Sequence, residues 1–246
     1  PTDVVGDLNG IFNFDQLDYD GATADAFVNS ALVHRMRRRT EIHSAELNCV
    51  WGLPLLGGQC SPWRFRALAG FRYFRLSDDL QFASDTVDTV FTGAVDELYY
   101  NIDVDNNLYG LQFGGIGERQ LGASRWSANF GAKAGIFANQ AEADSFIGGA
   151  AGAATINNGP NAGRAWDISA NKDAVSFLGE LQAGVGYRIF GNWRLLAEYR
   201  IVGLSGVALP SNQIYQDLRG LQDVQLLAAN GSLILHGAFF GVERLY

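Results

Sequence analysis

The segment from Trp63 to Leu76 is the stretch that most restricts how this chain can fold. Its sequence, WRFRALAGFRYFRL, places Trp63, Phe65, Ala67, Ala69, Phe71 and Tyr73 on one side and Arg64, Arg66, Gly70 and Arg72 on the other. This period of two predicts a β-strand. An aromatic face opposite three arginines suits a strand that separates lipid from a polar lumen better than a strand in a soluble core.

The same alternation predicts seven further strands. Their expected ranges are 7–15, 41–51, 107–117, 126–139, 174–190, 193–201 and 230–246. The connections between the eight strands alternate between long and short, as in outer-membrane barrels with long outside loops and short periplasmic turns. The sequence therefore predicts an all-β, antiparallel, up-and-down transmembrane β-barrel of eight strands that occupies residues 1–246 as one domain.

The first long connection contains apolar residues at helical spacing, which predicts a short helix over 23–36 with Thr23 as its N-cap. A basic cluster follows, made of Arg35, Arg37, Arg38 and Arg39. Guanidinium groups bind phosphate well, so this cluster is a candidate contact for the phosphates of outer-leaflet lipid. A solvated basic patch remains the alternative.

Two other long connections have distinctive compositions. The connection over 77–106 is acidic, and a solvated loop explains it better than a calcium site because it matches no EF-hand spacing. The connection over 140–171 is rich in Gly, Ala and Asn, which predicts a mobile loop. The sequence predicts no metal site.

The polar faces of the predicted strands define a charged lumen. Its members are Glu46, Arg64, Arg66, Arg72, Lys133, Glu180, Arg188, Arg194, Glu198 and Arg200. The interior of an eight-stranded barrel is just filled by side chains, and buried charges must be paired. These residues predict an internal ion-pair network, with a cation-lined pathway for anions as the alternative.

Aromatic residues next to the predicted short turns form a candidate membrane girdle. They are Trp63, Trp126, Tyr187 and Trp193, together with Tyr246 at the end of the terminal strand. Trp and Tyr favour the membrane–water interface because their rings are amphipathic.

The two cysteines, Cys49 and Cys60, flank a predicted turn that contains Gly and Pro. This spacing predicts a small disulfide loop in an oxidising compartment. Two unrelated reduced thiols remain the alternative.

Composition removes several classes of function. The chain has no apolar run of about 18 residues, so a membrane role would depend on strands. A net charge of −8 argues against nucleic acid as a partner. The start at Pro1 carries no apolar leader and is interpreted as a mature or trimmed start.

Catalytic signals are poor. The three histidines are His34, His43 and His236, and His43 is adjacent to Ser44, so the two side chains of that pair point to opposite faces of a strand. The nucleophile-elbow, phosphate-loop and zinc patterns are lacking. We therefore expect a protein that is not an enzyme and has no cofactor. A soluble lipocalin-like ligand barrel and an outer-membrane lipid-modifying enzyme are the alternatives.

Five sequence blocks lie, in this order, at 67–80, 106–115, 133–139, 203–213 and 230–243. Together they resemble a known family, the beta-barrel porin family seven of bacterial outer membranes. The resemblance implies integral location in the outer membrane, where lipid is a partner. The long outside loops make surface proteins candidate partners. It implies no transported solute and no catalytic residue.

Overall fold

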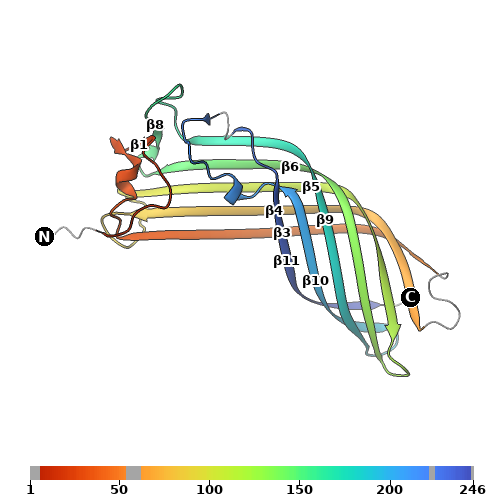
Figure 1. Cartoon of the computed structure of the whole chain (residues 1–246). Coiled ribbons are helices and arrows are strands. Elements are labelled where there is room, and N and C mark those ends of the chain that lie inside the picture. The colour runs from red at the N-terminus through yellow and green to blue at the C-terminus, as the bar shows by residue number, and fades with distance from the viewer. Residues whose placement is uncertain (1–5, 54–61, 222–224, 245–246) are drawn as a thin grey trace.

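The computed structural model describes residues 6–53, 62–221 and 225–244, and its main feature is one curled antiparallel sheet (Figure 1). The long strands are β3 (Val33–Gly52), β4 (Trp63–Asp85), β5 (Glu97–Gln120), β6 (Trp126–Gly149), β9 (Asp167–Arg188), β10 (Trp193–Val207) and β11 (Gly231–Arg244). Their order across the sheet is β11-β10-β9-β6-β5-β4-β3, and the short strand β7 (Gly152–Ala153) pairs with β6. The predicted all-β, up-and-down antiparallel fold is confirmed.

The remaining elements are short and lie at one end of the long strands (Figure 1). They are β1 (Leu17–Tyr19), β2 (Ala22–Thr23), β8 (Thr155–Ile156) and the 3-10 helices η1 (Ala24–Phe27) and η2 (Pro210–Asn212). We call this end the long-loop end, because 86–96, 150–166 and 208–230 connect strands there. The other end is the short-turn end. No helix in the described ranges is long and apolar enough to cross a membrane.

The predicted strand over 7–15 is wrong. In this segment only Leu8 pairs, through a single bridge to Ala31. Phe14 is 1% exposed and its backbone N–H donates to Asp25 Oδ1, so the aromatic residues here belong to a folded cap. Packing over the end of the sheet has overridden the local alternation.

The predicted helix over 23–36 is also wrong. The helical part is limited to η1, and β3 begins at Val33. Arg35 to Arg39 therefore lie in a strand that pairs residue by residue with 79–83 of β4.

The acidic segment 77–106 and the glycine-rich segment 140–171 are mostly strand, against the loop prediction. β4 continues to Asp85, β5 begins at Glu97, and β6 and β9 extend to Gly149 and from Asp167. The period of two persists through these segments, but the apolar set changes sides, so Leu98, Tyr100, Ile102 and Val104 are buried on the inner face.

The inner face of the sheet is therefore apolar toward the long-loop end. There the cap packs against the sheet in one cluster whose largest buried side chains include Trp166, Phe14, Leu98, Ile102, Ile147 and Ile156. A second cluster lies on the inner face and is formed by Phe74, Leu76, Leu108, Phe137, Leu178, Leu204, Val207 and Leu209. Burial of these side chains contributes about 1.5–3 kcal/mol each and fixes the cap to the sheet.

Candidate functional site

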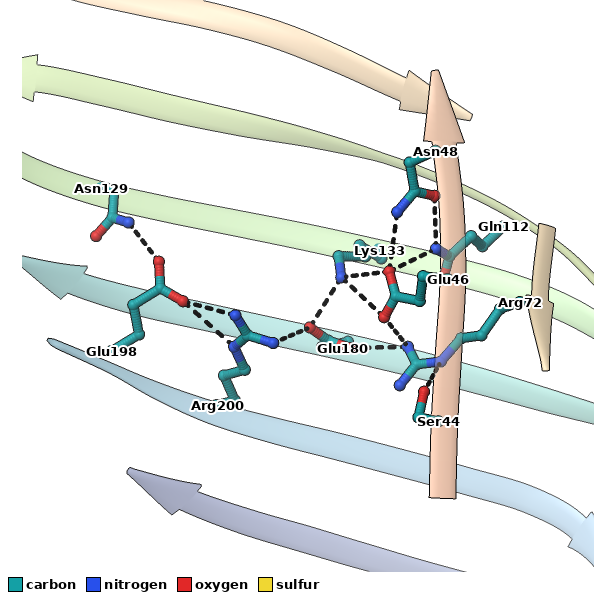
Figure 2. Close-up of polar contacts among 10 residues, drawn as sticks. All are labelled: Ser44, Glu46, Asn48, Arg72, Gln112, Asn129, Lys133, Glu180, Glu198 and Arg200. Atoms are coloured by element: carbon teal, nitrogen blue, oxygen red, sulfur yellow. Dashed lines mark hydrogen bonds and ion pairs between the residues drawn. The ribbon is translucent and has the colours of Figure 1, made fainter. Parts of the chain in front are cut away.

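Toward the short-turn end, the inner face carries a network of charged side chains centred on Glu180 of β9 (Figure 2). The Glu180 side chain is 2% exposed, and its Oε2 accepts a hydrogen bond from Arg72 Nη1 at 2.7 Å. Lys133 Nζ lies 3.1 Å from Glu180 Oε1, and Arg200 Nη1 lies 3.9 Å from the same atom. Three cations from β4, β6 and β10 thus surround one buried carboxylate.

Glu46 of the edge strand β3 is the second acid of this network (Figure 2). It lies 3.2 Å from Arg72 and 3.0 Å from Lys133, and Gln112 Nε2 donates to its Oε2 at 2.8 Å. Arg72 also donates from Nε to Ser44 Oγ at 3.0 Å. Arg72 and Lys133 therefore each bridge two carboxylates, which is an arrangement that compensates buried charge.

Arg200 extends the network along β10. Its Nη2 donates to Glu198 Oε2 at 2.8 Å, and Asn129 Nδ2 donates to the other oxygen of Glu198 at 2.6 Å. The guanidinium carbon of Arg200 lies 4.7 Å from the centre of the Phe239 ring. The central network holds three cations, Arg72, Lys133 and Arg200, and three anions, Glu46, Glu180 and Glu198, so its formal charge is balanced.

A separate charge cluster lies closer to the short turns. Arg194 is 5% exposed, forms an ion pair with Glu118, and donates from Nε to Glu243 Oε2 at 2.9 Å. Arg66 Nη2 lies 3.5 Å from Glu118 Oε2. This cluster links β4, β5, β10 and β11 at the end of the lumen.

The structure brings eight of the ten predicted lumen residues into these two clusters. The other two, Arg64 and Arg188, lie on the same face but are exposed near the short turns. The sequence-based set of lumen residues lacks seven participants: Ser44, Asn48, Gln112, Glu118, Ser127, Asn129 and Glu243. Glu118 lies one residue beyond the predicted strand over 107–117, whereas Gln112 alternates with Leu111 and Phe113 inside it, so the period of two could have placed Gln112 on the polar face.

Between the charged network and the long-loop end, two buried asparagines form hydrogen bonds that tie down the connection after β10. Asn106 donates from Nδ2 to the Ala208 carbonyl and accepts from the Ala208 N–H, both at 2.8 Å. Asn139 Nδ2 donates to Asn106 Oδ1 at 3.0 Å. These bonds fasten the connection after β10 across the inner face, between the apolar layer and the cap.

The outer face of the sheet carries an apolar belt with a sharp boundary, which we call the outer belt. Its uppermost row, read across five adjacent strands, is Ala45, Tyr73, Tyr109, Ala138 and Val175. Two residues further toward the long-loop end the row is His43, Arg75, Asn107, Gln140 and Asp173. The change from apolar to polar residues therefore occurs between the same two rows of cross-strand partners on five strands.

The height of the outer belt matches a membrane barrel. On β4 it runs from Trp63 to Tyr73, which is ten residue steps or about 33 Å along the strand. A strand tilt of about 40° reduces this to about 25 Å, the height of the apolar band of outer-membrane barrels.

The predicted girdle residues lie at the lower edge of this belt. Trp126 and Tyr187 are cross-strand partners with ring centres 4.9 Å apart. The guanidinium carbons of Arg119 and Arg244 lie 5.8 Å and 5.9 Å from the rings of Trp63 and Trp193. Tyr246 lies outside the described residues. Aromatic residues along one edge of an apolar belt are typical of a membrane–water boundary.

The basic cluster is divided between the two faces of β3. Arg38 points inward, where its Nε donates to Asp78 Oδ1 at 2.9 Å. Arg35, Arg37 and Arg39 share the outer face beyond the belt, and Arg39 forms an ion pair with Glu41. Arg35 Nη2 donates to Gln81 at 3.1 Å and its guanidinium covers the Phe91 ring.

Next to these arginines, three aspartates are direct cross-strand neighbours. Asp79, Asp103 and Asp144 form one row across β4, β5 and β6. Burial and the charges of Asp79, Asp144 and Asp105 raise the pKa of Asp103. Burial and nearby carboxylates likewise raise the pKa of Asp79. The described residues contain no group of His, Cys, Asp or Glu placed to hold a metal ion.

Cys49 lies exposed on the outer face of β3. Cys60 lies outside the described residues, so their disulfide stays a prediction.

A curled antiparallel sheet with a polar, ion-paired inner face and an apolar outer belt defines the β-barrel class of proteins. The chain belongs to one family of this class, Putative beta barrel porin-7 (BBP7), whose model matches residues 31–243. That range begins just before β3 and ends in β11, so it covers all seven long strands. Searches of curated proteins and of solved structures returned no significant match.

Proposed function

We propose that this protein is an integral β-barrel protein of a bacterial outer membrane, with the outer belt in the bilayer. The observation that carries the proposal is the common polarity boundary, which lies between Tyr73 and Arg75 and between their cross-strand partners on four further strands. A soluble barrel has no reason to expose aromatic residues below one line and charged residues above it. Family membership supports the same location.

In this setting the cap and the outer halves of the long strands stand on the outside of the membrane. Beyond the boundary, β4 and β5 each continue for about ten residues with polar outer faces. Outer-membrane barrels place their longer connections outside. The protein therefore presents a folded, strand-built surface to the exterior, which suits a structural or surface-interaction role.

The interior argues against a general porin. The balanced network around Glu180, the apolar layer above it and the cap fill successive levels of the lumen. Porins with open channels use 16–18 strands, whereas about eight strands leave space that side chains fill. We propose a narrow lumen plugged by its own side chains. Membership in a porin-like family also favours a role that is not enzymatic.

The outer arginines of β3 are the candidate lipid contact. Arg37 and Arg39 lie six and four residues beyond His43, on the outer face and at the level expected for lipid head groups. Both side chains are exposed. We propose that they bind phosphates of the outer leaflet, while Arg38 has the internal role of pairing with Asp78.

Planar-bilayer recording tests this function. We expect the purified protein to insert from detergent and to show conductance far below that of a general porin measured in the same bilayers. Large, stable channels from single molecules would contradict the plugged lumen. A protein that remains monomeric in buffer without detergent would contradict the membrane location and favour a soluble lipocalin-like barrel.

A further inference from the structure

The curled sheet has two edges that face each other. β3 and β11 are the terminal strands of the sheet order, and in the ranges 6–53, 62–221 and 225–244 no strand pairs with the outer edge of either one. A cavity of about 700 Å³ opens between them and extends to the charged network, because Arg72, Glu180 and Arg200 line it together with Ile42, Ser44 and Glu46 of β3 and 235–239 of β11. An unpaired strand edge is a row of free N–H and C=O groups, which is costly in lipid.

The directions of the two edges restrict how the sheet can close. Seven antiparallel strands alternate in direction, so the first, β3, and the last, β11, both run from the long-loop end to the short-turn end. Direct pairing of β3 with β11 would therefore be parallel. One intervening strand that runs the opposite way would pair antiparallel with both edges and would give an even count.

Side-chain exposure on the inner face shows that space is left at both edges. Ile42 of β3 is 42% exposed, whereas its cross-strand partner Leu76 is fully buried. Val50 is 49% exposed, whereas its partner Leu68 is 3% exposed. On β11, Phe239 is 47% exposed. Each of these apolar side chains lacks a neighbour on the side away from the sheet.

Two glycines of β11 provide an independent measure of the space. A Cβ added at Gly237 or Gly241 would meet no atom within 4 Å. At Gly70 and Gly110, on the inner face of β4 and β5, an added Cβ would lie within 2.3 Å of a neighbouring backbone atom. A side chain at Gly70 or Gly110 would therefore collide with a neighbouring strand, whereas open space adjoins Gly237 and Gly241 of β11.

Contacts across the lumen indicate how many strands the closed barrel would have. Arg72 of β4 reaches Glu180 of β9, and Glu46 of β3 reaches Lys133 of β6, each across three strand spacings. Side chains that meet directly across the lumen are typical of a barrel of about eight strands. The sheet of seven long strands is therefore one strand short of such a barrel.

We propose that the gap is filled by one antiparallel strand of the same polypeptide, formed by residues that precede Pro1. Residues 6–32 lie at the long-loop end and enter β3 there. A strand that runs opposite to β3 ends at the long-loop end, so the cap segment 6–32 becomes its connection to β3. This gives four long connections and places both chain ends at the short-turn end.

The gap also defines the chemistry of the missing strand. Its outward residues are apolar, to continue the outer belt between Leu47 on β3 and Phe240 on β11. Its inward residues include large side chains, which fill the open space over Gly237 and Gly241. About ten residues with this alternation span the belt.

Amide hydrogen exchange tests the proposal in two polypeptides folded in detergent micelles, residues 1–246 and the full polypeptide that the gene encodes. In residues 1–246, every second amide of the belt segments of β3 and β11 should exchange rapidly. In the full polypeptide, these amides should become protected, together with a segment before Pro1. The interior strand β5 is the control and should be protected in both.

Three results would overturn the proposal. Full protection of both edges in residues 1–246 would mean that β3 and β11 pair directly. Rapid exchange at the edges of the full polypeptide would mean that no such strand exists. Protection that depends on residues after Tyr246 would place the strand at the other end of the chain. None of these results depends on channel activity or on cellular location, so they leave the proposed function to its own test.

The variant Gly237→Phe gives a second measurement. The Phe side chain fits the open space in residues 1–246, where the thermal transition should not move. In the full polypeptide it competes with the inserted strand, so the transition temperature should fall by several degrees. An equal effect on both polypeptides would contradict a strand over Gly237.

Discussion

Arg72 and Glu180 are 108 positions apart in sequence and come from strands that are not neighbours, yet their side chains lie 2.7 Å apart inside the curled sheet. Both side chains are almost fully buried. This contact fixes the distance between β4 and β9 across the lumen, and it makes Glu180 the acid on which the inner network depends.

The first prediction is that Glu180→Ala destabilises the protein more than any single substitution of an exposed acid. Removal of one partner from a buried ion pair costs about 3–5 kcal/mol because the remaining charge is left uncompensated. Here Arg72 and Lys133 lose a shared partner. The apolar outer belt leads us to expect a fold that resists SDS until heated, and the temperature at which this form unfolds, followed by gel mobility, measures the loss.

Asp217→Ala is the matched control. Asp217 pairs with Arg219 on a connection outside the sheet, and both side chains are exposed. An exposed ion pair contributes about 0–1 kcal/mol, so this variant should unfold near the temperature of the unchanged protein. Equal effects of the two substitutions would show that the buried network does not hold the lumen together.

The second prediction concerns the polarity boundary on β5. Phe113 lies on the outer face near the middle of the belt, opposite Ala69, and Asn107 lies on the same face just beyond the belt. An arginine on the lipid face costs about 2–4 kcal/mol near the bilayer midplane and about 0–1 near its edges. Phe113→Arg should therefore reduce folding into lipid vesicles strongly and Asn107→Arg only slightly, as measured by denaturant titration. Similar losses would place the boundary elsewhere.

The alternation in 63–73 predicted the face of each residue that it assigned, because inside and outside differ sharply in polarity there. The same rule could have predicted the strands over 77–106. Leu80 and Phe82 alternate with Asp79 and Gln81, but the apolar residues have moved to the other face. The acidic composition concealed this pattern, since beyond the outer belt the strands carry polar residues on their outer faces.

The pairings of the lumen could not be predicted in the same way. The alternation placed Glu46, Arg72 and Glu180 on the inner face, but which of them meet depends on the register and curvature of strands that are not adjacent. The cap was missed for a related reason. Phe12 and Phe14 pack against Tyr100 of β5, a contact that no local period reports.

The third prediction is that Asp103→Asn stabilises the outer half of the sheet at neutral pH. Like charges that lie directly opposite on neighbouring strands destabilise a sheet, and Asp103 faces Asp79 and Asp144. The amide removes both repulsions, so we expect a gain of about 0.2–1 kcal/mol in denaturant unfolding. Asp167→Asn, at the end of β9, is the comparison and should have no such effect.

The pH dependence of this effect has a definite sign. Because the pKa of Asp103 is raised in the folded state, the folded protein binds a proton more readily than the unfolded chain. The destabilisation is therefore present at neutral pH and is relieved as the pH falls through the raised pKa. The gain from Asp103→Asn should shrink in acid, and a constant gain would contradict the charge explanation.

The fourth prediction is the disulfide between Cys49 and Cys60. Closure of a loop of about ten residues contributes roughly 2–3 kcal/mol in the chain-entropy model. Mass spectrometry of unreduced protein should find neither thiol free to react with an alkylating reagent. Alkylation of both cysteines without reduction would contradict the pairing.

The last prediction concerns Glu97, which holds the connection 86–96 against the start of β5. Its buried carboxylate accepts hydrogen bonds from the Tyr99 hydroxyl and from the backbone N–H groups of Thr92 and Gly93. Burial opposes ionisation, but these donors prevail and lower the pKa of Glu97 to about 2. The hydrogen bond from Tyr99 requires that its hydroxyl keep its proton. Burial together with Glu97 raises the pKa of Tyr99 to about 12.

A carboxyl group with a lowered folded-state pKa stabilises the fold above its unfolded pKa of about 4.5 and loses that contribution as the pH falls toward about 2. Amide protection factors at Thr92 and Gly93 should therefore be constant from pH 7 to pH 5 and should fall between pH 4.5 and pH 2, the window set by these two pKa values. Glu97→Gln, which cannot ionise, should show low protection at every pH and no transition. Protection that is unchanged in acid would mean that the turn is held by its backbone alone, and a transition that persists in Glu97→Gln would assign it to another carboxylate, such as Asp85 at the end of β4.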